Sequence, residues 1–210
     1  MSVTAIVPLK ALHHAKQRLS GRLTAGQRRA LMRDVFLHVL DVCRATAAID
    51  QIIAVVGDDA GAALAARRSV TVVHEPGGGL NHAIRHATGG LPAGTTSLIV
   101  VADLPELTVD DLSAVITTGD AAPGVLVAPT HDGGTGALLR RPPDVIAPAF
   151  GVASAAAHLR AAQQAGVRAG LIWRRGLARD IDHPADLDRY AGTVADSGEL
   201  RGAWFHEADG

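Results

Sequence analysis

The chain has 210 residues, enough for one domain with a buried core, and 48% of them are hydrophobic while only 3% are aromatic. A net charge of −1 gives no strong basic surface, which argues against a nucleic-acid-binding role. No apolar run reaches the roughly 18 residues of a membrane span, so we expect no membrane association. The single Cys43 excludes an internal disulfide, and its place in a predicted helix indicates a small buried residue.

Short apolar runs alternate with helical patterns in the first half of the chain. The segment Met1–Lys10 enters a predicted strand without the layout of a signal peptide, so we expect a cytoplasmic protein. Thr24 and Gln27 have the spacing of a capping box and predict the start of a long helix. The other predicted elements are strands at Val3–Pro8, Gln51–Val56 and Val70–His74 and helices at Asp58–Arg67 and Leu80–Thr88.

The second half continues this alternation. Ser97–Ala102 is the most apolar run and predicts a fully buried strand. Thr108 and Ser154 each predict a helix start, because hydroxyl side chains cap N-termini. The other predicted elements are strands at Gly124–Pro129, Ala137–Arg140 and Leu171–Trp173 and a helix at Ala185–Tyr190. Together they predict one α/β domain over residues 1–192, with a mainly parallel central sheet flanked by helices, and a loosely held tail over 193–210.

Three aspartates follow predicted strands, at the edge where open α/β sheets bind ligands. Asp103 comes directly after Ser97–Ala102, and Asp180 and Asp182 follow the last predicted strand. In an extended segment the i, i+2 spacing points both carboxylates to one side. Three converging carboxylates repel one another unless a cation lies between them, and Mg²⁺ prefers such oxygen ligands. Simpler roles also fit: Asp103 could only open a turn, and Asp182 could only cap the following helix.

Cations follow the first predicted strand. Lys10, Lys16 and Arg18 lie in the loop after Val3–Pro8, which the sheet would bring to the same edge. They could neutralise a triphosphate, with each Lys as a point charge and Arg as a fork, or they could be solvated loop cations. The Walker pattern G-x-x-x-x-G-K-[ST] does not occur, so this loop is not a P-loop.

Glycine-rich loops supply further candidates. The segment 77–81 (GGGLN) lies between a strand and a helix, where bare backbone can approach a ligand. It fails the dinucleotide pattern because His82 occupies the third glycine position. The segment 133–136 (GGTG) fits a tight hairpin better than a substrate cradle. Ser154, together with Gly151, could bind a phosphate instead of only capping a helix.

The ten histidines form no recognisable metal motif. His82 and His86 are four residues apart but lack the glutamate of H-E-x-x-H, so exposed or capping histidines are expected. No serine lies in G-x-S-x-G, and C-x-x-C does not occur. The sequence therefore offers neither a hydrolase nucleophile nor a dithiol redox site.

Several segments in order together resemble the guanylyltransferase family that activates 2-phospho-L-lactate or phosphoenolpyruvate in the biosynthesis of coenzyme F-420. They extend from Ile6 to about Tyr190 and are IVPLK with AKQRLS, GGLNHAI, VVADLP, GGTGALL with RPP, FGVAS, and DIDHPADL. The resemblance implies the Rossmann-like nucleotidyltransferase fold that the wider relatives share. It also implies that GTP and a small phosphorylated carboxylic acid are the substrates, that Mg²⁺ is the cofactor, and that a homodimer is possible.

The resemblance also implies roles for individual residues. These are magnesium on Asp103, Asp180 and Asp182; the GTP phosphates on Lys16 and Arg18; the guanine nucleoside near Gly79 and Asn81; and the acceptor on Thr135, Gly151 and Ser154. Many relatives have Asn directly after the threonine, where this chain has Gly136, so the match at Thr135 is weaker than the match at Asp103.

The implied reaction is GMP transfer from GTP to the phosphate of the acceptor, with pyrophosphate as the leaving group. Such a phosphate is already anionic, so Asp103, Lys16 and Arg18 would act by positioning and charge neutralisation, without a general base. We predict phosphoenolpyruvate as the acceptor, by analogy with bacterial relatives; 2-phospho-L-lactate and 3-phosphoglycerate differ from it by a few atoms. Two other functions stay open: a nucleotidyltransferase for a molybdopterin or sugar phosphate, and a non-catalytic GTP-binding regulator.

Overall fold

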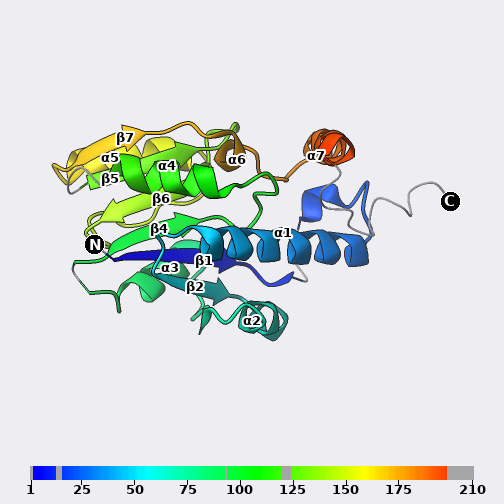
Figure 1. The fold of residues 1–210 in the computed structure, drawn as a ribbon, viewed down its shortest axis with the longest axis horizontal. Helices are drawn as coiled ribbons and strands as arrows, with labels where there is room; N and C mark the ends of the chain where they lie inside the picture. Colours follow the sequence, from blue (N-terminus) through cyan, green and yellow to red (C-terminus); the bar gives the residue numbers. More distant parts are fainter. Residues whose placement is uncertain (1, 13–15, 93, 120–123, 198–210) are drawn as a thin grey trace.

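One seven-stranded sheet runs through the molecule, and helices cover both of its faces (Figure 1). The computed structural model describes residues 2–12, 16–92, 94–119 and 124–197. In the order in which they pair, the strands are β3 (Thr71–His74), β2 (Gln51–Val56), β1 (Val3–Leu9), β4 (Thr96–Val100), β6 (Thr135–Arg141), β5 (Gly124–Pro129) and β7 (Arg168–Leu171). All neighbours are parallel except the two pairs made by β6. The predicted α/β fold with a mainly parallel sheet is confirmed.

Some of the helices begin with a side-chain cap and others do not. They are η2, a 3-10 turn (Gln17–Leu19), α1 (Ala25–Ala45), α2 (Asp59–Ala66), α3 (Leu80–Thr88), α4 (Val109–Gly119), α5 (Ser154–Gln164), α6 (Arg175–Ala178) and α7 (Pro184–Ser197). Thr24 and Gln27 form the predicted capping box at α1, each side chain accepting from the other's backbone N–H. Thr108 and Asp111 bond in the same reciprocal way at the start of α4.

Two apolar clusters, one on each face of the sheet, form the main core. One cluster joins the sheet to α1, α2, α4 and α6 and includes Phe36, Leu112 and Leu177. The other joins it to α3 and α5 and includes Ile84 and Ala162. Strands β1 and β4 contribute to both clusters because alternate residues of a strand face opposite sides. Aliphatic side chains supply almost all of this core, as the low aromatic content predicted.

A third, smaller cluster lies beyond the sheet. It consists of Leu19, Leu31, Val35, Ile181, Leu187 and Tyr190. Through it, η2 and α7 pack against the first turns of α1 and against each other, although they are far apart in the sequence (Figure 1). This packing brings the segment that contains Lys16 and Arg18 close to the segment that contains Asp180 and Asp182.

The start of α5 differs from the prediction. The residue before the helix is Ala153, in a left-handed conformation with φ of 52°, and it makes no side-chain cap. Ser154 is the first helical residue, and its hydroxyl donates to Thr135 instead of to the helix backbone. The prediction that Ser154 caps α5 is therefore wrong, because a tertiary hydrogen bond takes its hydroxyl.

Two elements near the C-terminus also differ from their predicted ranges. The late strand is β7, which pairs with β5 from Arg168 onwards, and not Leu171–Trp173; pairing along β5 outweighs the apolar pattern. Helix α7 continues beyond Tyr190 to Ser197, because the single Gly192 lowers helix propensity without ending the helix. The rest of the predicted tail, 198–210, lies outside the described residues. Within the described part of the chain, no helix has both the length and the apolar character needed to cross a membrane.

Candidate active site

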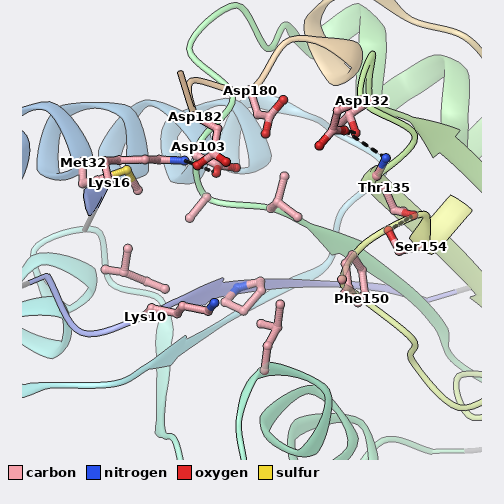
Figure 2. Close-up of a pocket in the computed structure, with 18 of the residues that line it drawn as sticks. Lys10, Lys16, Met32, Asp103, Asp132, Thr135, Phe150, Ser154, Asp180 and Asp182 are labelled. Atoms are coloured by element: carbon pink, nitrogen blue, oxygen red, sulfur yellow. Dashed lines mark hydrogen bonds and ion pairs between the residues drawn. The ribbon is translucent and has the colours of Figure 1, made fainter. Parts of the chain in front are cut away.

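A cavity of about 430 Å³ opens at the sheet edge where β1 and β4 end (Figure 2). Because β6 runs antiparallel to β4, its first residue lies at this same edge. Most of the predicted site residues line the cavity: Lys10, Lys16, Arg18, Asp103, Thr135, Gly151, Ser154, Asp180 and Asp182. Of the predicted residues, Gly79 and Asn81 do not line it, although Leu80 between them does.

One end of the cavity is charged. The Lys16 Nζ lies 2.5 Å from Asp103 Oδ2 and 3.5 Å from Asp182 Oδ1, and Figure 2 shows its side chain reaching toward both. The Arg18 guanidinium donates to the other carboxylate oxygen of Asp182. Burial opposes the charge of Lys16, but the nearby carboxylates of Asp103, Asp182 and Asp180 outweigh it and raise the pKa of Lys16. This lysine is therefore an ammonium at neutral pH.

A short segment brings the other aspartates to Asp103. The Ile181 N–H donates to the Asp103 carbonyl oxygen at 3.2 Å, and the Ile181 side chain is buried in the third apolar cluster. Asp180 and Asp182, on either side of it, both line the cavity, as their i, i+2 spacing predicted. The chain just before them is anchored as well, since the His131 N–H donates to the Ala178 carbonyl at 3.0 Å.

Asp180 differs from the two paired carboxylates. Among the described residues no side chain donates a hydrogen bond to it, and burial together with the charge of Asp103 raises its pKa to about 6. No three His, Cys, Asp or Glu side chains in the described ranges lie close enough together to hold a metal ion unaided. The donors still suit magnesium, which takes one or two carboxylates and completes its shell with waters and substrate phosphates. A divalent cation would neutralise the excess negative charge that Asp103 and Asp180 share.

The other end of the cavity is lined by the uncharged side chains of Thr135 and Ser154, and we call it the neutral end, although the carboxylate of Asp132 lies beside it (Figure 2). The Ser154 hydroxyl donates to Thr135 Oγ1 at 2.9 Å, and Nδ1 of His158 lies 3.1 Å from that same oxygen. On its far side, His158 Nε2 accepts from the Ala149 N–H at 2.9 Å. All three side chains are buried. Burial and the charge of Arg140 lower the pKa of His158 to about 4, so its ring is uncharged at neutral pH.

Asp132, which the sequence did not single out for the site, also lines the cavity. Its carboxylate accepts from the Thr130 hydroxyl at 2.5 Å and from the Gly134 N–H at 3.0 Å, and these bonds lower its pKa. The turn that it closes joins β5 to β6, so the glycine loop is the hairpin that the sequence favoured. An Asp-Gly-Gly turn directly after a buried strand was the signal that could have identified it.

The residue after Thr135 has no room for a side chain. A Cβ atom on Gly136 would lie 1.9 Å from the carbonyl oxygen of Leu177 in α6. The Asn that many relatives have at this position could not occur here unless α6 moved. The close approach of β6 and α6 therefore explains the departure from the family pattern.

Asn81 contacts a loop of the cavity wall instead of the cavity itself. Its amide nitrogen donates to the Phe150 carbonyl at 2.9 Å, and its amide oxygen accepts from the Phe150 N–H at 2.7 Å. Gly77, Gly78 and Gly79 all have positive φ, between 80° and 86°, which explains the run of three glycines before α3. The roles of Gly79 and Asn81 at a guanine nucleoside stay predictions.

The simpler roles considered for the aspartates do not match their contacts. Asp103 and Asp182 both bond the ammonium of Lys16. Just before α7, the Asp186 carboxylate accepts hydrogen bonds from the backbone N–H groups of Asp182 and His183. Among the described residues, the Asp182 carboxylate makes no capping hydrogen bond. It is directed to Lys16 and Arg18.

The remaining sequence candidates have structural roles. The Nδ1 atom of exposed His82 lies 2.6 Å from the Gly77 carbonyl oxygen, so this histidine closes the glycine loop. Cys43 is fully buried, and burial raises the pKa of its thiol to about 12, which agrees with the predicted buried apolar role.

The sequence matches known proteins over most of its length. A family model described as guanylyl transferase CofC like matches residues 3–191. The chain belongs to this family. The phosphoenolpyruvate guanylyltransferase of Sphaerobacter thermophilus is 41% identical over 197 residues, which cover 91% of this chain and 94% of that protein. The 3-phospho-D-glycerate guanylyltransferase of Colwellia psychrerythraea is 29% identical over 193 residues, covering 91% and 92%.

Solved structures agree on the fold. A Desulfovibrio desulfuricans G20 protein, proposed to be a nucleotide-diphospho-sugar transferase, superposes with a TM-score of 0.76 at 16% identity, covering 98% of this chain and 93% of that one. The predicted Rossmann-like nucleotidyltransferase fold is confirmed, and so is the predicted family. The protein is therefore a nucleotidyltransferase of the guanylyl-transferring kind.

Proposed function

We propose that this protein transfers GMP from GTP to the phosphate of phosphoenolpyruvate and releases pyrophosphate, as a step in the formation of coenzyme F-420. The observation that carries the proposal is a single cavity with one charged end and one neutral end lined by hydroxyls. Two anionic substrates can lie next to each other only if each meets its own donors or cations. The cavity suits a reaction that joins two phosphate-bearing molecules.

The charged end would take the triphosphate of GTP. Lys16 and Arg18 would turn from their carboxylate partners to phosphate oxygens, with Lys10 nearby at the cavity wall. Asp103, Asp180 and Asp182 would provide the carboxylates for magnesium, of which one or two would bind it directly while waters and substrate phosphates complete its shell. Magnesium, when bound, would supply positive charge that neutralises phosphate oxygens. Because the acceptor phosphate is already anionic, the side chains contribute position and charge, and none has to remove a proton.

The neutral end would take the acceptor. Thr135 and Ser154 line this end of the cavity (Figure 2). Gly151 also lines it and lets the backbone approach a ligand because it has no side chain. Neutral donors can bind an anion without competing for the cations that the triphosphate needs. The acceptor's phosphate or carboxylate would accept a hydrogen bond from the Thr135 hydroxyl, whose oxygen accepts from Ser154.

Phosphoenolpyruvate is favoured by the names of relatives, which include a phosphoenolpyruvate guanylyltransferase from Roseiflexus sp. (strain RS-1) that is 37% identical over 188 residues. The Colwellia relative named for 3-phospho-D-glycerate supports that acid as a second candidate. 2-Phospho-L-lactate is the third. Each carries a phosphate close to a carboxylate, so the same cavity chemistry suits all of them.

Pyrophosphate release tests the proposal directly. Purified protein with GTP and magnesium is supplied with phosphoenolpyruvate, 2-phospho-L-lactate, 3-phosphoglycerate or no acceptor. We expect the highest kcat/KM with phosphoenolpyruvate and no release without an acceptor. If another acid is turned over equally well or better, that acid would replace phosphoenolpyruvate as the proposed acceptor. Folded protein that binds GTP but releases no pyrophosphate with any of them would overturn the proposed activity and favour a regulator.

We also propose that the protein acts in the cytoplasm, as expected from the sequence, and that it is a homodimer, as the family resemblance implies. Light scattering at micromolar concentration measures the mass in solution against the 21.6 kDa of one chain. A mass of one chain at all concentrations tested would remove the dimer from the proposal.

A further inference from the structure

The buried ring of His158 has no part in the reaction proposed above, yet it joins two pieces of the cavity wall. Its exposed fraction is 0%. It lies on α5 four residues after Ser154, about one turn, so both side chains point to the same face of the helix. One ring nitrogen faces Thr135 at the start of β6, and the other faces Ala149 in the loop before α5. The edge of the ring also contacts Phe150, with centroids 4.9 Å apart.

The backbone decides which nitrogen of His158 carries the proton. The Ala149 N–H can only donate, so Nε2, 2.9 Å away, must accept and carries no hydrogen. A neutral imidazole has one N–H, which is therefore on Nδ1. Nδ1 lies 3.1 Å from Thr135 Oγ1, so His158 donates to the threonine oxygen. A second proton on Nε2 would face the Ala149 N–H, which excludes the charged ring from this arrangement.

The Thr135 hydroxyl then has a single direction left for its own hydrogen. A hydroxyl has one hydrogen and two acceptor positions. Both acceptor positions of Oγ1 are filled, one by the Ser154 hydroxyl at 2.9 Å and one by His158. Within the described residues, Thr135 Oγ1 has no other hydrogen-bond partner, and Thr135 lines the cavity.

We propose that His158 is a positioning residue: by donating to Thr135 Oγ1 it fixes the threonine hydroxyl as a donor directed into the cavity, toward an oxygen of the bound acceptor. This inference rests on the proposed function, since it names the donor that the acceptor meets. The favoured ligand group is a phosphate or carboxylate oxygen, which can only accept. A ligand that presents a hydroxyl or amine hydrogen to Thr135 would meet a donor that cannot turn away, so the device also selects against such compounds.

The first test needs no substrate. Nitrogen-15 NMR of the His158 ring in the free protein reports which nitrogen is protonated. We expect the Nδ1–H tautomer from pH 6 to pH 8. An Nε2–H tautomer or a charged ring in that range would overturn the proposal, whatever the protein's activity proves to be.

The second test separates the two hydrogen bonds of His158 with matched variants. The amide nitrogen of Asn is bonded to Cγ, as Nδ1 is, so His158→Asn retains the donor to Thr135 and loses the acceptor for Ala149. His158→Gln reaches the position of Nε2 and does the reverse. We expect His158→Gln to raise the KM for phosphoenolpyruvate by about tenfold and to leave the KM for GTP within about twofold, the size expected for one hydrogen bond. His158→Asn should stay within about threefold of the wild type for both.

A double-variant cycle with Thr135→Val decides whether His158 acts through the hydroxyl. If it does, His158→Gln adds less than about twofold to the acceptor KM once Thr135 is Val. Full additivity, or equal increases in the KM for GTP and for the acceptor, would show a merely structural histidine. If His158→Gln does not fold, a folded His158→Asn with a tenfold higher acceptor KM overturns the proposal equally well. If the wild type releases no pyrophosphate, the proposed function is refuted. The NMR measurement still tests the His158 tautomer independently of activity.

Discussion

The two ends of the cavity hold their polar groups in opposite ways. At the charged end ion pairs hold the cationic side chains: Lys16 is bonded to Asp103 and Asp182, and Arg18 is bonded to Asp182. At the neutral end, Ser154 and His158 surround the Thr135 hydroxyl with uncharged hydrogen bonds. In the proposed function, the cations would have to exchange partners when the triphosphate binds, whereas the Thr135 hydroxyl would already be arranged to donate to an anion.

This difference separates what each end contributes to catalysis. In the proposed function, groups at the charged end would neutralise charge that moves during the reaction, so their loss should lower turnover. Groups at the neutral end would bind acceptor oxygens other than the attacking phosphate oxygen, so their loss should mainly weaken acceptor binding. Substitutions at the two ends can therefore test whether one end affects turnover and the other affects acceptor binding.

The largest effect is expected for Asp103→Asn. It removes a proposed magnesium ligand and the main partner of Lys16, so kcat/KM for guanylyl transfer should fall by about three orders of magnitude. The fold should be retained, because Asp103 is not a core residue. Pyrophosphate release measures the change, and Asp110→Asn on the exposed surface of α4 is the matched control. Near-normal turnover of Asp103→Asn would remove this residue from the site.

Lys16→Met should cost about a hundredfold in kcat/KM, because a buried ammonium is lost from the triphosphate end. Arg18→Gln should cost only about tenfold, since the Arg18 side chain is 66% exposed and solvent weakens its charge. Arg22→Gln, which removes an exposed ion pair with Asp188, is the control and should be neutral. The ranking fails if Arg18→Gln is more damaging than Lys16→Met.

The buried histidine predicts how stability depends on pH. The folded pKa of His158, about 4, is below the usual value of 6.5, so the unfolded chain binds the extra proton first as pH falls. The stabilisation is therefore complete above pH 6.5 and is lost as pH falls toward 4. Between pH 7 and pH 5 the free energy of unfolding should drop by about 2 kcal/mol more in the wild type than in His158→Gln. Urea titrations measure it, and equal pH slopes would contradict the lowered pKa.

Ser154→Ala should raise the acceptor KM by about tenfold with little change in kcat or in the KM for GTP. The reason is that Thr135 Oγ1 loses one of its two donors, so the threonine hydrogen gains a second direction. Ser113→Ala, on the half-buried face of α4, is the control. A loss confined to kcat would mean that the neutral end takes part in the chemical step.

The smallest effect is expected at Cys43, which lies in the core of α1 away from both ends of the cavity. Because burial raises its pKa to about 12, the native protein should not react with a thiol reagent such as iodoacetamide at pH 8, and activity should be unchanged. Mass spectrometry after labelling measures this. Fast labelling without unfolding would show that this part of the core opens readily.

The charged end was predictable because it depends on local signals. A buried apolar run followed by Asp103, and two aspartates in i, i+2 positions, are visible along the chain. The sheet order then brings them together, with Ile181 hydrogen-bonded to the Asp103 carbonyl. Fold class, most element ranges and the α1 capping box followed from periodicity and end signals of the same local kind.

The neutral end was less visible because it is made by tertiary contacts. The glycine segment 133–136 predicts a hairpin, but nothing in the sequence indicates that β6 pairs antiparallel with β4, which is what puts Thr135 at the ligand-binding edge. The Ser154 hydroxyl fits a helix cap equally well until Thr135 is known to be adjacent. His158 had one local signal, its position four residues after Ser154, but its importance depends on the loop that contains Ala149.

The contact between Gly136 and Leu177 has a consequence for how substrate choice could be altered. The backbones of β6 and α6 touch there, so neither can be reshaped by a side chain at that point. A mutational library aimed at new acceptors should leave Gly136 unchanged, because any side chain there would clash with the backbone of Leu177. The productive positions are side chains that line the cavity from separate elements, such as Leu80, Phe150 and Met32. New specificity in this protein is therefore expected to arise from these lining side chains and not from the contact between β6 and α6.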